Sequence, residues 1–188
     1  MPDGYVTYDP PAYAPEVSPL PALREGFVTF GCFNYRGKIS NTIVEAWAKI
    51  LGRVPESRLV LKYRGMNDIG VASRLAGEFA GRGIDPQGIE FQGWSAHADL
   101  LREYHRIDLA LDSYPYNGGL TTCEALWMGG PVITCPGETF ASRHSLSHLS
   151  NIGLTETIAT SLEDYVEVAV ALANNLPRLE ALRRGLRE

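Results

Sequence analysis

The chain has 188 residues, of which 45% are hydrophobic and 21% charged, a balance that suits one globular domain with a sizeable core. Its formal net charge is -5 and it has no basic run. These features argue against a nucleic-acid partner, because proteins that bind phosphate backbones usually carry a basic patch. No apolar run approaches the roughly 20 residues of a membrane-spanning helix, so we expect no membrane partner.

The three cysteines, Cys32, Cys123 and Cys135, are odd in number and show no metal-ligand spacing. We therefore expect neither a disulfide framework nor a zinc site, and small buried positions in a reducing compartment suit these residues better. Because no signal-peptide pattern follows Met1, we expect the protein in the cytoplasm.

Residues 1–26 are rich in proline. Such a composition predicts a linker or an extended N-terminal segment without much core of its own, with a disordered tail as the alternative. We place the domain itself at residues 27–188.

The hydrophobic pattern of residues 27–188 predicts strands and helices in alternation. Short apolar and β-branched runs predict strands at 27–33, 58–63, 88–91, 109–111 and 132–134. Helical spacing of apolar residues predicts helices at 41–51, 68–82, 96–105, 123–128, 142–151, 162–174 and 177–188. Asp68 and Ser161 are the expected N-caps of two of these helices. The alternation predicts an α/β fold with a doubly wound, mostly parallel, Rossmann-like sheet.

The segment 108–143 combines a strand, a glycine loop, a helix and a second strand. Such a βαβ unit is expected to be right-handed, with its loop at the carboxyl edge of the sheet. The loop runs to Leu120, and Thr121 and Thr122 open the helix, where free N–H groups and the helix dipole favour phosphate. Glu124 follows in the first turn, and its carboxylate can accept hydrogen bonds from two sugar hydroxyls.

Three loops should converge at that edge, because functional loops in such folds follow the strands. They carry Lys38, then Trp94 with His97, then the two threonines. An ammonium, an imidazole and a helix N-terminus around one crevice suit a diphosphate. Sugar transfer needs such donors, because negative charge accumulates on the departing nucleoside diphosphate.

The glycine loop and its helix carry a family resemblance. Residues 115–129, P-Y-N-G-G-L-T-T-C-E-A-L-W-M-G, resemble the donor-binding segment of protein O-linked N-acetylglucosamine (O-GlcNAc) transferases and, more closely, of their SPINDLY-like relatives, which transfer fucose. Residues 136–143, P-G-E-T-F-A-S-R, are similar to the family's next loop, and residues 33–39, F-N-Y-R-G-K-I, to its phosphate-contacting lysine segment. The similarity runs in order over roughly residues 25–188 and covers only the second half of the family's catalytic region.

The resemblance implies the C-terminal, donor-binding lobe of a two-lobed GT-B glycosyltransferase, which moves GlcNAc or fucose from UDP or GDP to protein hydroxyls. Implied partners are a nucleotide sugar, an acceptor protein, the missing N-terminal lobe and upstream TPR repeats. The family's presumed base, a histidine, would come from the missing lobe, so we assign no catalytic residue and expect little or no transfer by this chain alone. The alternative is a non-catalytic nucleotide-binding or protein-interaction module.

By the same resemblance, Lys38, Thr121 and Thr122 hold the diphosphate, and Glu124 holds the ribose. His97 stands where some family members have a donor-contacting side chain. Each role has a plain structural alternative: a solvated lysine for Lys38, a helix cap for the threonines and His97, and a dipole-complementing carboxylate for Glu124.

Two further positions separate the branches of the family. Tyr35 stands where the N-acetylglucosamine transferases have a glutamine, and Leu120 where they have a histidine. Leu120 favours the SPINDLY-like side. With Gly119, both belong to the predicted nucleotide-sugar-binding set.

We expect no metal or other cofactor, because no Asp-x-Asp pair occurs. His144 and His148 have a metal-ligand spacing, but no glutamate follows His144 as in H-E-x-x-H, so a structural role is favoured. Neither a G-x-G-x-x-G or G-x-x-x-x-G-K-[ST] loop nor a G-x-S-x-G elbow is present, which argues against a dehydrogenase, a P-loop enzyme and a serine hydrolase.

Overall fold

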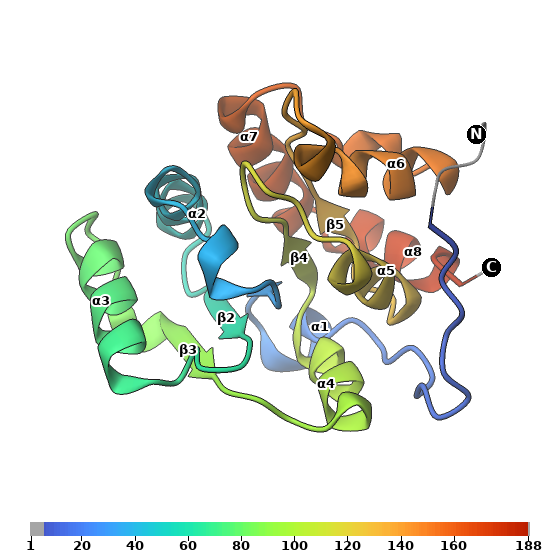
Figure 1. Ribbon diagram of the computed structural model, residues 1–188, viewed down its shortest axis with the longest axis horizontal. Helices are drawn as coiled ribbons and strands as arrows, with labels where there is room; N and C mark the ends of the chain where they lie inside the picture. The colour runs from blue at the N-terminus through green and yellow to red at the C-terminus, as the bar shows by residue number, and fades with distance from the viewer. Residues whose placement is uncertain (1–5, 188) are drawn as a thin grey trace.

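The centre of the molecule is a parallel sheet (Figure 1), seen in a computed structural model that describes residues 6–187. Its strand order is β3-β2-β1-β4-β5, and all four pairings are parallel. The strands are β1 (Thr29–Cys32), β2 (Arg58–Lys62), β3 (Ile89–Gln92), β4 (Leu109–Leu111) and β5 (Val132–Ile133). The predicted α/β fold with a doubly wound parallel sheet is confirmed.

Eight α-helices surround this sheet within the described residues. They are α1 (Ala22–Glu25), α2 (Asn41–Arg53), α3 (Ile69–Ala80), α4 (His97–Glu103), α5 (Leu120–Trp127), α6 (His144–Asn151), α7 (Leu162–Ala173) and α8 (Leu176–Gly185). The expected N-caps are confirmed, because Asp68 accepts from Gly70 N and Ser161 from Asp164 N. The predicted end of the last helix at Glu188 lies outside the described residues.

Two predicted helix starts differ from the structure by two residues or more. α5 begins three residues before the predicted start at residue 123, because Gly119 already lies at its N-cap position. α6 begins at His144 rather than at residue 142, because Phe140–Ser142 form a separate 3-10 turn. α1 was not predicted, since four residues among prolines give no periodic pattern.

The two faces of the sheet are covered by different helices (Figure 1), because successive side chains of a strand point to opposite sides. Leu59 and Leu61 of β2 join the core that holds buried residues of α2, α3 and α7. Val60, between them, joins a second core with residues of α4, α5 and α6. The near-continuous apolar strands therefore bury both faces, as expected of a parallel sheet.

The strand order creates the crevice for a site. The chain runs from β1 outward to β2 and β3, and then returns to the other side of β1 to form β4 and β5. The loops after β1 and β4 therefore leave neighbouring strands in opposite directions. At such a switch point the carboxyl edge of the sheet opens, and open α/β sheets bind their ligands there.

The N-terminal segment lies along the domain and is held by the C-terminal helix. Arg183 of α8 is 1% exposed and donates to Ser18 O at 2.7 Å and to Ile107 O at 3.0 Å. The buried Asp108 carboxylate accepts from Ala22 N and Thr29 N, each at 2.8 Å. Residues 6–26 are packed at these points, and the domain boundary at residue 27 stays a prediction.

Arg183 should contribute far more to stability than its neighbour Arg184, which is exposed and pairs with Glu180 one turn away. Arg183→Met leaves several buried carbonyls without a donor, so we expect the free energy of unfolding to fall by about 2–4 kcal/mol. Arg184→Met is the matched control and should change it by less than about 0.5 kcal/mol. Urea denaturation measures both, and equal effects would contradict this account of α8.

Candidate functional site

The loops after β1 and β4 are joined by side-chain hydrogen bonds at the carboxyl edge. Asn34, which follows β1, donates through Nδ2 to Asp112 Oδ1 at 3.2 Å and to Ser113 Oγ at 3.1 Å. Its Oδ1 accepts from Thr121 Oγ1, at the start of α5. The loop after the central strand is therefore fastened to the helix that the sequence predicts as the phosphate site.

Asp112 was not predicted to belong to this site, and it is the centre of the arrangement. Its carboxylate is 2% exposed and accepts from Gly118 N at 2.7 Å, Ser113 N at 2.9 Å and Thr134 Oγ1 at 2.7 Å. Burial raises the pKa of Asp112, and the hydrogen bonds it accepts oppose that rise. An acidic residue directly after the buried strand 109–111 was the signal available in the sequence.

The start of α5 presents free backbone donors. Gly119 is the N-cap residue, and its carbonyl accepts from Thr122 N and Cys123 N at 3.1 and 3.3 Å. No described residue accepts from the N–H groups of Leu120 or Thr121. Leu120 is 62% exposed, so its backbone can be approached from solvent. An anion can therefore bind this end of the helix.

The two adjacent threonines have different surroundings. Thr122 is 3% exposed, and its hydroxyl bonds to Ser145 Oγ at 2.9 Å, toward α6. The hydroxyl of Thr121 lies toward Asn34 at the crevice. Gly118 lies so close that a Cβ there would come within 2.5 Å of Thr122 Oγ1. Thr121 Oγ1 would lie 2.9 Å from the same Cβ, so the loop needs glycine at this position.

Lys38 lies against the same loop. It ends a 3-10 turn, Arg36–Lys38, and its Nζ donates to Asn117 O at 2.7 Å while lying 3.9 Å from the centre of the Tyr116 ring. Its side chain is half-buried, and desolvation lowers its pKa. This geometry differs from that of a freely solvated loop lysine, and the predicted phosphate contact of Lys38 stays a prediction.

His97 and Glu124 form a pair. Nε2 of His97 lies 2.7 Å from Glu124 Oε1, and Nδ1 lies 2.8 Å from the hydroxyl of Tyr13 in the N-terminal segment. Glu124 is 2% exposed, and burial raises its pKa while His97 opposes the rise. Since both ring nitrogens have protein partners, a ligand reaches this pair by exchanging one of those contacts or by using the remaining carboxylate oxygen.

Tyr35 stands at the rim of the crevice. It is 49% exposed, and its ring meets the edge of Tyr63 with 5.5 Å between ring centres. Its predicted place in the nucleotide-sugar set is not tested by these contacts.

A pocket of about 500 Å³ opens beside α5, between the loops that follow β1, β2 and β3. Its lining residues are Phe33, Lys62, Tyr63, Arg64, Gly93, Trp94, Ser95, His97, Leu100 and Thr121. Its volume is in the range of small-molecule sites. It contains two residues of the predicted set, His97 and Thr121. Another pocket, of about 360 Å³, lies at the opposite edge of the sheet, near the starts of β1, β2 and β3, away from these loops.

Two negative findings apply to the residues that the structure describes. No group of three or more His, Cys, Asp or Glu side chains is placed to hold a metal ion. None of the helices between residues 6 and 187 combines the length and the apolar character needed to cross a membrane.

The Asp112 contacts give a prediction about stability and pH. Asp112→Asn replaces an acceptor oxygen by a donor, and we expect unfolding at about pH 7 to require about 2–3 kcal/mol less. Because the folded state raises the pKa above its ordinary value of 3.8, the wild-type contribution is greatest below that value. It declines as pH rises through the folded-state pKa, so the difference between wild type and variant should shrink as pH rises above about 4.

Urea denaturation at several pH values checks this prediction, with Asp99→Asn, at an exposed carboxylate of α4, as the control. A difference that grows as pH rises would contradict the assignment.

The chain is similar in sequence to known proteins over most of its length. The model of glycosyl transferase family 41 matches residues 20–188. The Petunia hybrida protein named probable UDP-N-acetylglucosamine–peptide N-acetylglucosaminyltransferase SPINDLY is 38% identical over 189 residues, which cover 100% of this chain and 20% of that protein. The chain thus spans about one fifth of the length of the curated relatives it matches first.

Solved structures also resemble this chain. A mutant O-GlcNAc transferase of Thermobaculum terrenum superposes with a TM-score of 0.89 and 39% identity, covering 95% of this chain and 34% of that chain. Anabaena HepE, solved with UDP and glucose, shares the fold at a TM-score of 0.63 and 15% identity, over 92% of this chain and 47% of its own. The fold is therefore that of a lobe of a GT-B glycosyltransferase, and the chain belongs to glycosyl transferase family 41.

Proposed function

We propose that this chain is the donor-binding lobe of a protein O-glycosyltransferase that transfers GlcNAc or fucose from UDP or GDP to Ser/Thr hydroxyls. The observation that carries the proposal is the contact of Lys38 with the loop that leads into the open start of α5, at the switch point between β1 and β4. The names of the relatives support a sugar nucleotide as donor and a protein as acceptor.

The proposed chemistry needs positive groups where the leaving diphosphate develops charge. The Lys38 ammonium and the free N–H groups of Leu120 and Thr121 supply them without a metal ion. The Asn117 carbonyl that Lys38 now contacts is a neutral acceptor, so a phosphate oxygen can compete for the ammonium through a charge-assisted hydrogen bond.

The ribose is proposed to bind at Glu124, through the carboxylate oxygen that His97 leaves free. His97 then keeps the carboxylate oriented. Tyr13 holds the other side of the imidazole, so the N-terminal segment takes part in shaping the site.

The chain alone is proposed to be incomplete, because the relatives are much longer. Trp94, Leu120 and Phe140, at 69%, 62% and 69% exposure, place apolar surface in the loops of the carboxyl edge. That surface suits burial by the N-terminal lobe, and TPR repeats and a cytoplasmic location complete the proposal. A non-catalytic nucleotide-binding or interaction module is the second candidate, favoured by the absence of an assigned catalytic base.

Calorimetric titration with UDP and GDP tests the donor site. We expect one of the two to bind and Lys38→Ala to weaken that binding about tenfold or more, the size expected for loss of a charged hydrogen bond. Lys49→Ala, at an exposed lysine paired with Glu45, is the matched control and should leave binding unchanged. If the folded chain binds neither nucleotide, the donor-lobe proposal fails.

Substitutions of the two threonines should have different effects on nucleotide binding in the same titration. Thr121→Val should weaken nucleotide binding several-fold, because its hydroxyl lies at the crevice and fixes Asn34. Thr122→Val should leave binding within about twofold but lower the free energy of unfolding by about 1–2 kcal/mol, because Ser145 loses its buried partner. The reverse pattern would place the diphosphate deeper, toward α6.

A further inference from the structure

A buried lysine, which no sequence pattern predicted as a site residue, forms part of the pocket beside α5. Lys62 is the last residue of β2, is 5% exposed and lines the pocket of about 500 Å³. Lysine is almost never fully buried unless it is paired. Among the described residues, Lys62 forms no ion pair with a carboxylate.

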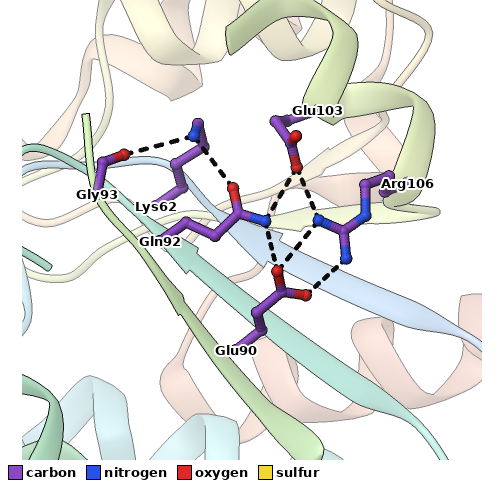
Figure 2. A network of polar contacts seen from close by, with 6 residues as sticks. All are labelled: Lys62, Glu90, Gln92, Gly93, Glu103 and Arg106. Atoms are coloured by element: carbon purple, nitrogen blue, oxygen red, sulfur yellow. Dashed lines mark hydrogen bonds and ion pairs between the residues drawn. The ribbon is translucent and has the colours of Figure 1, made fainter. Parts of the chain in front are cut away.

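A polar network fixes the group that faces Lys62 (Figure 2). The amide nitrogen of Gln92 donates to Glu90 Oε1 at 2.7 Å and to Glu103 Oε2 at 3.0 Å. Arg106 holds both carboxylates, at 2.6 Å from Glu90 and 2.9 Å from Glu103. Because these carboxylates only accept, the amide must turn its oxygen toward Lys62 Nζ, 3.1 Å away.

One N–H of the Lys62 ammonium has no acceptor among the described residues and can donate to a ligand. The ammonium has three, and it donates to Gln92 Oε1 and, at a long 3.4 Å, to Gly93 O. Both acceptors are neutral. A buried ammonium without a full set of acceptors is costly, so a ligand that brings an acceptor oxygen into the pocket gains affinity there.

The position of Lys62 in the sheet indicates which part of the ligand brings that oxygen. β1 lies between β2, which carries Lys62, and β4, which leads to the phosphate-binding start of α5. Two strand spacings separate them, about 10 Å. A diphosphate at α5 therefore places its nucleobase, not its phosphates, near Lys62.

The pocket walls suit a base. Tyr63 and the 69% exposed Trp94 offer aromatic faces, and Phe33 lies at the same pocket. Stacking on such faces holds any base without choosing among them. A polar group at the base edge must make that choice.

Resting on the proposed function, we propose that Lys62 is the residue that selects the nucleobase, by donating to a keto oxygen on the base edge. Uracil and guanine carry such an oxygen where cytosine and adenine carry an amino group. An amino group facing the ammonium would set donor against donor and leave Lys62 unsatisfied, so the site discriminates against it.

Calorimetry with matched nucleotide pairs, UDP against CDP and GDP against ADP, tests the proposal. Wild type should prefer the keto member of the pair it binds by about tenfold or more. Lys62→Met, which keeps the length of the side chain, should abolish that preference by weakening the keto nucleotide alone. Lys49→Met is the matched control and should keep the preference. Circular dichroism checks folding, and Lys62→Gln serves as a second variant.

Titration with inorganic pyrophosphate, which has no base, distinguishes contacts to the nucleobase from contacts to the phosphates. Its binding should be unchanged by Lys62→Met and weakened by Lys38→Met. An unchanged preference in a folded Lys62 variant overturns the proposal, as does an equal loss for all four nucleotides and pyrophosphate, which would place Lys62 on the phosphates. In both cases wild-type binding still supports the donor lobe, whereas no binding by wild type overturns the donor lobe and this proposal together.

Discussion

The site depends on one buried carboxylate, Asp112, at the carboxyl end of β4. It gathers backbone N–H groups from both ends of the glycine loop, at Ser113 and Gly118, and a hydroxyl from Thr134 beyond β5. Through Asn34 it also reaches the loop after β1. A loop that ends in two glycines loses much conformational entropy when it is ordered, and these bonds fix it in the one shape that opens the start of α5.

At this edge of the sheet, the negative and the positive side chains have different kinds of hydrogen-bond partner. Buried carboxylates lie beneath the loops, where hydrogen-bond donors satisfy them, as at Asp112 and in the Glu124–His97 pair. The positive groups, Lys38 and Lys62, instead contact neutral carbonyl or amide oxygens. Acceptors of that kind hold a cation in place without neutralising it, so its attraction for an anion or a keto oxygen is kept for the ligand.

Much of the site could be predicted, because it follows from the order of elements. Lys38 and Thr121 lie in segments that follow predicted strands, and parallel strands bring their carboxyl ends to one edge. Lys62 and Asp112 were not predicted as site residues. Each lies at the end of an apolar strand or directly after it, where a polar residue indicates only that the strand ends. The Tyr13–His97 contact joins residues 84 positions apart, and no local pattern encodes it.

The sequence by itself determined the parallel sheet, the helices on both of its faces and the glycine loop, because hydrophobic period and turn chemistry act over a few residues. It also carried the family resemblance. Only the tertiary structure decided that Thr122 turns toward Ser145, that His97 is held between Tyr13 and Glu124, and that Arg183 is buried against Ser18. These pairings depend on which surfaces meet when the layers pack, and side-chain hydrogen bonds form only after that packing has set the distances.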